Sequence, residues 1–183
     1  MRTRRTSRWT VAALALTVAA PTWAAATLPD TAATTVIVVR HAEKMPHSPG
    51  SDAGLSPAGV RRADALRRAL SDAHVAAIYS SPFGRARQTG LPLAAQLHDS
   101  VRVMGADDIE GLVARVRREN RGQTVLVIGH SDTVPKILEA LCERALPDLG
   151  DIDYDRMYVV TLLPGRPATL LRLRYGDVLE PAK

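Results

Sequence analysis

The sequence predicts one α/β domain, built as a three-layer sandwich with helices on both faces of a mainly parallel sheet. Two patterns lead to this fold class. Short apolar, β-branched segments alternate with longer segments of helical periodicity, as expected for parallel strands covered on both sides. A length of 183 residues suits one well-packed core, and the 46% hydrophobic and 23% charged content is that of a globular protein.

Residues 1–26 are expected to be a secretory signal peptide. Four arginines precede an uncharged, mostly apolar segment at 9–20, and a small-residue cluster at 24–26 offers a cleavage site. The apolar segment is too short to span a bilayer comfortably. We therefore expect residues 27–183 to form the mature domain, without a membrane span, in the periplasm or secreted.

The basic net charge does not indicate a nucleic-acid partner. The formal charge is +5, and residues 1–26 contribute four arginines and no acidic residue, which leaves +1 for the mature chain. A nearly neutral domain lacks the basic surface that binding to phosphate backbones requires. No nucleic acid is expected as a partner.

Six apolar segments are expected to form the sheet: residues 34–39, 75–79, 101–104, 124–128, 157–163 and 168–175. Helices are expected in the four intervals between the first five strands. Ser81-Pro82 is expected to begin the second helix, which runs to about Leu97, and the fourth helix is expected to end near Arg144.

The first helix has a clear start signal and an apolar face. Ser56 is suited to the N-cap and Pro57 to the first helical position. The spacing predicts a buried face made of Val60, Ala63, Leu66 and Leu70. The residues expected to face solvent are Arg61, Arg62, Arg67 and Arg68.

Two strands end in the same way. TTVIVVRHAE at 34–43 and QTVLVIGHSD at 123–132 each lead from a buried strand to a histidine, a small residue and an acid. Ligands of open α/β sheets bind outside the carboxyl ends of the strands. His41 and His130 are therefore expected to lie at one edge of the sheet.

Two arginines are expected at the same edge. Arg40 directly precedes His41, and Arg85 falls in the first turn of the helix that follows the second strand. Taken singly, a histidine or arginine at a strand end is usually structural. Together, two guanidinium groups and two imidazoles beside helix N-termini suit a phosphoryl group.

Four motifs in order carry a family resemblance. They are Arg40-His41-Ala42-Glu43, Leu55-Ser56-x-x-Gly59, Ser81-Pro82-x-x-Arg85-Ala86-x-Gln88-Thr89 and Gly129-His130. The chain resembles the histidine phosphatase superfamily, the phosphoglycerate-mutase-like group with an RHG signature, from about residue 34 to 175. The change from RHG to RHA is conservative in size.

The resemblance implies a phosphoglycerate-mutase-like fold and a phosphatase that works through a phosphohistidine intermediate. His41 would be the nucleophile, and Arg40, Arg85 and His130 would bind the phosphoryl oxygens and stabilise the transition-state charge. Arg40 would disfavour the imidazolium form of its neighbour. No metal or cofactor is implied. The substrate would be a small phosphomonoester, a phosphorylated sugar or a phosphoprotein.

The proton donor for the leaving oxygen stays open. In many relatives it is a carboxylate on the loop after the third strand, which here carries Asp107, Asp108 and Glu110. Asp107 and Glu110 also have the spacing of a capping box. Asp132, two residues after His130, is a further candidate, although it could instead cap the next helix.

Two other functions stay open as alternatives. A non-catalytic phosphate- or polyanion-binding protein would keep the arginines and tolerate loss of His41. A metal hydrolase would use His41, His130 and Asp132, but close-set motifs such as H-E-x-x-H are absent, and Arg40 would repel a divalent cation.

The remaining histidines and the one cysteine are expected to be structural. Cys142 cannot form an internal disulfide and is expected to be a small buried residue of the fourth helix. His74 and His98 lie near helix ends, where the helix dipole favours them. His47, in a loop rich in proline and glycine, is expected to be solvated.

Overall fold

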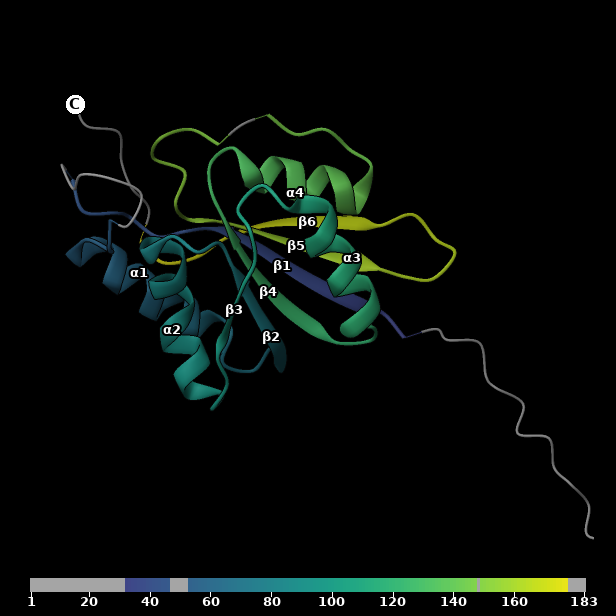
Figure 1. The fold of residues 1–183 in the computed structure, drawn as a ribbon, viewed down its shortest axis with the longest axis horizontal. Coiled ribbons are helices and arrows are strands. Elements are labelled where there is room, and N and C mark those ends of the chain that lie inside the picture. The colour runs from purple at the N-terminus through teal and green to yellow at the C-terminus, as the bar shows by residue number, and fades with distance from the viewer. Residues whose placement is uncertain (1–31, 47–52, 148, 178–183) are drawn as a thin grey trace, which may run out of the picture.

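The structure is a computed structural model that describes residues 32–46, 53–147 and 149–177. The expected signal peptide and His47 lie outside the described residues. A six-stranded sheet with the order β3-β2-β4-β1-β5-β6 forms the middle layer (Figure 1). Its strands are β1 (Thr34–Arg40), β2 (Val75–Ser80), β3 (Val101–Val103), β4 (Thr124–Gly129), β5 (Arg156–Leu162) and β6 (Thr169–Arg174).

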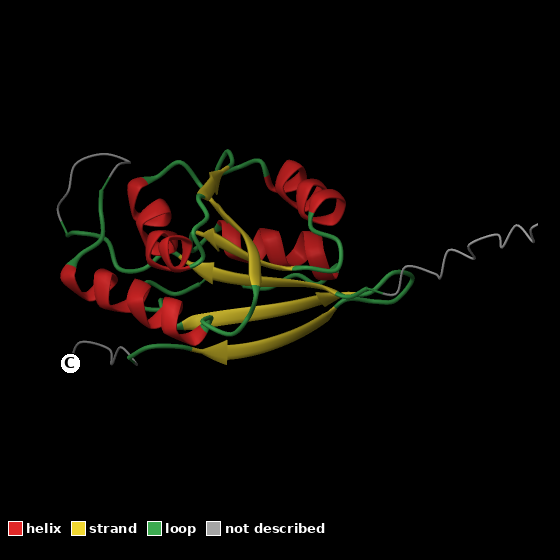
Figure 2. Cartoon of the chain, turned by 90° about the horizontal axis from the view of Figure 1, so that it is seen from below, coloured by secondary structure: helices red, strands yellow, loops and turns green. Residues whose placement is uncertain are grey.

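The sheet is mainly parallel, as predicted. β1, β2, β3 and β4 are parallel neighbours, whereas β5 pairs antiparallel with both β1 and β6. Figure 2 shows β5 running opposite to the strands beside it. The parallel part leaves the carboxyl ends of β1, β2 and β4 at one edge.

The helices cover both faces of the sheet and confirm the three-layer prediction (Figure 1). α1 (Pro57–Ala69) and α2 (Gly84–Gln96) pack on one face, and α3 (Ile109–Glu119) and α4 (Thr133–Cys142) pack on the other. Across the described ranges, no helix has the length and apolar character that crossing a membrane would need.

Alternation along β1 links the two halves of the core. Ile37 and Val39 pack in the cluster that includes α1 and α2, whereas Val36 and Val38 pack in the cluster with α3 and α4. Side chains of successive strand residues point to opposite faces, so an uninterrupted apolar strand must be buried on both sides. Burying each such side chain contributes about 1.5–3 kcal/mol.

The first helix begins as predicted, but its buried face is different. The Ser56 hydroxyl accepts a hydrogen bond from the Gly59 amide at 3.2 Å, and Pro57 is the first helical residue. Val60 is 57% exposed, whereas Arg62 is 5% exposed. The predictions for these two side chains were wrong. The helix turns Gly59 and Arg62 toward the core, and the Arg62 guanidinium contacts the half-buried Glu43 carboxylate at 2.8 Å.

Two helix starts also differ from the prediction. α2 begins at Gly84 and not at Ser81-Pro82, since the Ser81 hydroxyl contacts His130 instead of capping a helix. At α3 the N-cap is Asp108, whose carboxylate accepts a hydrogen bond from the Gly111 amide at 3.0 Å. Asp107, whose spacing to Glu110 also suited a capping box, does not have that role.

His74 and His98 follow α1 and α2 closely, as the sequence suggested. Both have left-handed backbone conformations, with φ of 48° and 53°. His98 directly follows Leu97, the C-cap of α2, where a left-handed residue commonly terminates a helix, whereas His74 lies in the turn before β2.

Candidate active site

Backbone pairing brings the two histidine-bearing strand ends together. β1 and β4 are parallel neighbours in which Arg40 is paired with Gly129. The His41 amide continues this pairing by donating to the Gly129 carbonyl at 2.9 Å. The centroids of the His41 and His130 rings consequently lie 5.1 Å apart, which confirms the prediction that both histidines share one edge.

The His41 ring is held with one nitrogen facing the site. Nδ1 lies 2.7 Å from the Ala42 carbonyl oxygen, so it carries the proton and donates it. Nε2 therefore keeps its lone pair and accepts a hydrogen bond from Arg85 Nε at 3.1 Å. Burial lowers the pKa of His41 to about 3, with His130, Arg85 and Arg40 adding to the shift and the bond to Ala42 opposing it.

Arg85 lies between the two imidazoles. While its Nε contacts His41, its Nη2 lies 3.5 Å from His130 Nδ1. Its position as the second residue of α2 places the guanidinium beside the N-terminal end of that helix, where anions are favoured. Its Cζ lies 4.7 Å from the centroid of the Phe83 ring.

Two further motif residues tie α2 to the loop that follows β1. The buried Thr89 hydroxyl accepts a hydrogen bond from the Ala42 amide at 2.9 Å and donates to the Arg85 carbonyl at 2.8 Å. The Gln88 side-chain oxygen accepts from the Leu55 amide at 2.8 Å. These contacts fix the segment after His41 relative to Arg85.

Arg40 is anchored by the loop between α4 and β5. Its Nη1 donates to the carbonyl oxygens of Gly150 and Asp151, at 2.8 Å and 3.2 Å. Tyr154 lies against the guanidinium, with its ring centroid 4.1 Å from Cζ and its hydroxyl 3.3 Å from Nη2. Arg40 Nε is buried and has no hydrogen-bond partner among the described residues.

Sequence reasoning missed Tyr154. Its ring lies 5.9 Å from that of His41, so it borders both Arg40 and the proposed nucleophile. No local pattern marks it, since it follows no strand end and belongs to none of the four motifs. Only the path of the loop before β5 brings it to the site.

His130 is buried and hydrogen-bonded at the opposite side of the site. Its Nε2 lies 2.7 Å from the Ser81 hydroxyl, and its amide donates to the Thr133 hydroxyl at 2.8 Å. Burial and the charges of Arg85 and Arg40 lower its pKa to about 4, while the carboxylates of Asp132 and Asp107 act in the other direction. The ring is therefore neutral near pH 7.

All four predicted site residues line one open cavity of about 360 Å³. Its other polar and aromatic lining residues include Lys44, Phe83, Asp107 and Asp132. Asp108 and Glu110 are not in the lining, and Asp108 is occupied as the α3 cap. The Asp132 side chain makes no capping hydrogen bond to α4.

The metal-hydrolase alternative has no support from the arrangement of side chains. Within the part of the chain that the structure describes, no three His, Cys, Asp or Glu side chains are grouped so that they could hold a metal ion. His41, His130 and Asp132 therefore do not form the ligand set that this alternative requires.

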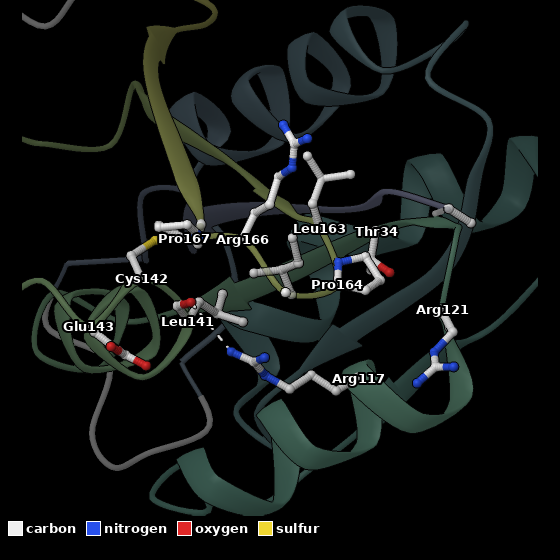
Figure 3. Close-up of a pocket in the computed structure, with 14 residues that line it drawn as sticks. Thr34, Arg117, Arg121, Leu141, Cys142, Glu143, Leu163, Pro164, Arg166 and Pro167 are labelled. Atoms are coloured by element: carbon white, nitrogen blue, oxygen red, sulfur yellow. Dashed lines mark hydrogen bonds between the residues drawn. The ribbon is translucent and has the colours of Figure 1, made fainter. Parts of the chain in front are cut away.

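Another cavity lies at the opposite edge of the sheet. Figure 3 shows the residues that line it. They include Thr34, the first residue of β1, and Cys142, the last residue of α4. Its volume is about 580 Å³, and it shares no residue with the cavity around the histidines. Arg117 there donates to the Leu141 carbonyl at the end of α4, at 3.4 Å. Arginine side chains commonly hydrogen-bond the last carbonyl groups of a helix, so this contact has a structural explanation.

Cys142 is half-buried and not fully buried as expected. It packs against the core cluster under α3 and α4, and it is a free thiol. Burial raises its pKa, which keeps the thiol protonated. This agrees with the structural role that the sequence suggested.

The fold and the site together define a class. Two guanidinium groups and two neutral imidazoles surround a cavity at the carboxyl edge of a parallel sheet, an arrangement suited to binding a phosphoryl group and transferring it to nitrogen. The model of the histidine phosphatase superfamily (branch 1) matches residues 36–106. Over this part the chain matches the histidine phosphatase superfamily, and together with the fold and the site this match supports a phosphoric monoester hydrolase.

Solved structures share the fold. The protein histidine phosphatase SixA complexed with tungstate is 22% identical, with a TM-score of 0.65 over 76% of this chain and 96% of that chain. A putative phosphohistidine phosphatase SixA from Nakamurella multipartitia is 25% identical, with a TM-score of 0.57 over 79% and 98%. A mycobacterial glucosyl-3-phosphoglycerate phosphatase is 18% identical, with a TM-score of 0.56 over 70% and 90%. No curated protein sequence gives a significant match.

Proposed function

We propose that this phosphatase hydrolyses phosphomonoesters through a phosphohistidine on His41, without a metal ion. The observation that carries the proposal is the state of the His41 ring. Nδ1 donates to the Ala42 carbonyl at 2.7 Å, so the lone pair of the neutral ring lies on Nε2, the nitrogen that faces Arg85. A neutral imidazole whose unprotonated nitrogen faces a cationic cavity has the properties of a phosphoryl acceptor.

Three side chains bind the phosphoryl oxygens in this proposal. Arg40 contributes Nε, its buried nitrogen without a partner among the described residues. Arg85 contributes its guanidinium from between the two histidines, and His130 contributes a ring N–H. Preorganised donors of this kind stabilise the charge of the transition state without reorganising during the reaction.

The reaction balances in two steps. His41 Nε2 bonds to phosphorus as the ester P–O bond breaks, and a carboxylic acid gives its proton to the leaving oxygen. Water then attacks phosphorus, the N–P bond breaks, and the same carboxylate takes a proton from the water. The products are an alcohol and inorganic phosphate, and His41 returns to its neutral form. Asp107 and Asp132, which line the cavity, are the candidate acids.

The substrate class follows from the openness of the site. A cavity of about 360 Å³ holds a phosphoryl group and part of a small leaving group. We propose a small phosphorylated molecule or an exposed phosphorylated side chain as substrate. The names of the similar structures include both a protein histidine phosphatase and a glucosyl-3-phosphoglycerate phosphatase, which supports testing both phosphoproteins and small phosphomonoesters.

Trapping of the phosphoenzyme tests the mechanism directly. The purified protein is incubated with a ³²P-labelled phosphomonoester in excess EDTA and quenched in alkali, alongside His41→Ala. We expect base-stable, acid-labile label on the unsubstituted protein only, and turnover that persists in EDTA. Rapid-quench sampling during turnover prevents a short-lived intermediate from being missed.

The same experiment separates the alternatives. Turnover without label in rapid-quench samples would contradict the phosphohistidine intermediate. Turnover lost in EDTA and restored by a divalent ion would contradict metal independence. If neither form turns over but both bind inorganic phosphate, the non-catalytic phosphate-binding function is the correct one.

We also propose that the protein is exported, with residues 1–26 removed. The support is the sequence pattern of arginines, apolar segment and small residues, which is typical of signal peptides. Expression of the full chain followed by fractionation and N-terminal sequencing tests this. A mature chain starting near residue 27 in the periplasm or medium is expected, and a cytoplasmic chain that keeps residues 1–26 would contradict export.

A further inference from the structure

Ser81 contacts a proposed phosphate ligand rather than capping a helix. It is buried, with 6% of its surface exposed, and its hydroxyl oxygen lies 2.7 Å from His130 Nε2. α2 begins only at Gly84, and no side chain caps it. His130 Nε2 is the only hydrogen-bond partner of the Ser81 hydroxyl in the described part of the chain.

The direction of this hydrogen bond follows from satisfying buried groups. A hydroxyl that donates to Nε2 has its hydrogen satisfied. A hydroxyl that accepts from Nε2–H would leave its own O–H buried without an acceptor, which is unfavourable. The contact therefore favours the ring form in which Nε2 is the acceptor.

The other nitrogen of His130 faces the phosphoryl site. Nδ1 lies 3.5 Å from Arg85 Nη2, which can only donate, but at this distance the contact is much weaker than the 2.7 Å contact of Nε2 with Ser81. The same guanidinium contacts His41 Nε2 through its Nε. A neutral imidazole has one N–H. With Nε2 as acceptor, this N–H is on Nδ1 and can be donated to a phosphoryl oxygen. In the other tautomer a lone pair would face that oxygen and repel it.

We propose that Ser81 is a positioning residue that keeps the proton of His130 on Nδ1. The proposal rests on the proposed function, since it makes His130 a neutral hydrogen-bond donor to the phosphoryl group. It also accounts for the serine of the Ser81-Pro82 motif without a capping role. The Thr133 hydroxyl completes the arrangement by accepting the His130 amide at 2.8 Å, which fixes the backbone.

Nuclear magnetic resonance measures the tautomer without any turnover. Long-range ¹H–¹⁵N correlation near pH 7 distinguishes a protonated Nδ1 from a protonated Nε2, and His130→Gln assigns the signals. We expect Nδ1–H in the unsubstituted protein and in Ser81→Thr, which keeps the hydroxyl. Ser81→Ala is expected to give a mixture of tautomers. Nε2–H in the unsubstituted protein, or an unchanged tautomer in Ser81→Ala, would overturn the proposal.

Kinetics provide the second measurement, with a matched control next to the site. Among the residues that the structure describes, the Ser80 hydroxyl is hydrogen-bonded only to the Ser81 carbonyl, at 3.0 Å, so Ser80→Ala removes a buried hydroxyl that is not bonded to His130. We expect Ser81→Ala to lower kcat roughly ten- to a hundredfold, with Ser81→Thr closer to the unsubstituted protein. Equal losses in Ser80→Ala and Ser81→Ala would indicate a merely structural role.

The two measurements distinguish failure of the proposed function from failure of the role proposed for Ser81. If no phosphomonoester is turned over, the proposed function fails, but the tautomer is still measured and the role of Ser81 in setting it can still be accepted or rejected. If turnover occurs and the tautomer does not depend on Ser81, only the positioning role fails. Thermal unfolding of each variant checks that the fold is intact.

Discussion

Arg85 shows how much depends on the shape of one side chain. Its Nε contacts His41 Nε2 at 3.1 Å while its Nη2 lies 3.5 Å from His130 Nδ1. A planar guanidinium spans both rings, and an ammonium group presents a single charged point. The planar arrangement of nitrogens in the guanidinium, and not its charge alone, therefore connects the two histidines.

Arg85→Lys is accordingly expected to lower kcat/KM by roughly a hundredfold or more, because lysine keeps the charge but loses the fork. Arg87→Lys is the matched control, since Arg87 is an exposed residue of the same helix that does not line the cavity. Steady-state kinetics on one aryl phosphate measure both. Equal activity of Arg85→Lys and the control would contradict the proposed role of the guanidinium.

The proton donor is identified by its dependence on the leaving group. Asp107 and Asp132 line the cavity, whereas Asp108 caps α3. Loss of the acid should slow an alkyl phosphate roughly a hundredfold, yet hardly affect an aryl phosphate whose leaving oxygen is weakly basic. We expect this selective loss in Asp107→Asn or Asp132→Asn, and none in Asp108→Asn. Equal effects on both substrates in all variants would exclude both aspartates as the donor.

At the scale of elements, α1 packs closely against the segment after β1. A Cβ built on Gly59 would lie 2.2 Å from the Glu43 carbonyl oxygen. Because the neighbour is backbone, it cannot move aside cheaply. Because Gly59 lies against the Glu43 backbone, the buried face of the helix is formed by Gly59, Arg62, Ala63 and Leu66. Val60 consequently faces solvent.

Gly59→Ala is therefore expected to destabilise the protein by about 1–3 kcal/mol, although alanine favours helices. Urea denaturation measures the free energy of unfolding. Val60→Ala, at an exposed position in the same helix, should change it by about 0.5 kcal/mol or less. A stabilised Gly59→Ala would mean that the helix can shift away from Glu43 without cost.

The ion pair of Arg62 and Glu43 joins three elements. Besides the 2.8 Å contact with Glu43, the Arg62 guanidinium donates to the carbonyls of Tyr175 and Asp177, at 3.2 Å and 3.0 Å. It thus links α1 to the segments that follow β1 and β6. The side chains are 3% and 13% exposed, so removing one partner leaves a largely buried charge.

Arg62→Met should consequently cost about 3–5 kcal/mol of unfolding free energy. The double variant with Glu43→Met should recover part of this loss, because no unpaired carboxylate remains. Arg61→Met, at the exposed neighbouring position, serves as the control and should be nearly neutral. A single variant as stable as the control would show that the pair contributes little.

At the scale of the whole molecule, folding keeps two imidazoles neutral. The pKa of His41 is lowered to about 3 and that of His130 to about 4, mainly by burial. Both lie below the ordinary histidine value of about 6.5, which the unfolded chain approaches. The unfolded state therefore binds more protons as the pH falls, and the folded state loses stability on acidification.

The full stability contribution of these histidines is expected above about pH 6.5 and decreases from there toward pH 4 and pH 3. Between pH 7 and pH 5 the unfolding free energy should fall by roughly 2–4 kcal/mol. Urea denaturation at both pH values measures this for the unsubstituted protein and for His41→Gln/His130→Gln. The double variant should lose distinctly less, and equal losses would refute the assignment to these rings.

Much of the architecture and of the site could be predicted from local sequence patterns. Apolar segments such as 34–39 and 124–128 indicated buried parallel strands, and all six expected strands are present. Arg40, His41 and His130 were predictable because polar residues at the ends of parallel strands must share one edge of the sheet. Arg85 was predictable from its place in the helix after β2. The roles of these residues in catalysis stay predictions.

The order of elements, the sheet type and the residues at its carboxyl edge follow from the sequence alone, because periodicity and strand ends are local properties. Which polar side chains find partners depends on the tertiary structure. Arg62 can be buried because the Glu43 carboxylate lies 2.8 Å from its guanidinium, although the two residues are 19 positions apart in the sequence. Tyr154 reaches Arg40 across 114 residues, and Ser81 reaches His130 across 49. Such contacts arise from packing between distant segments, which no local pattern encodes.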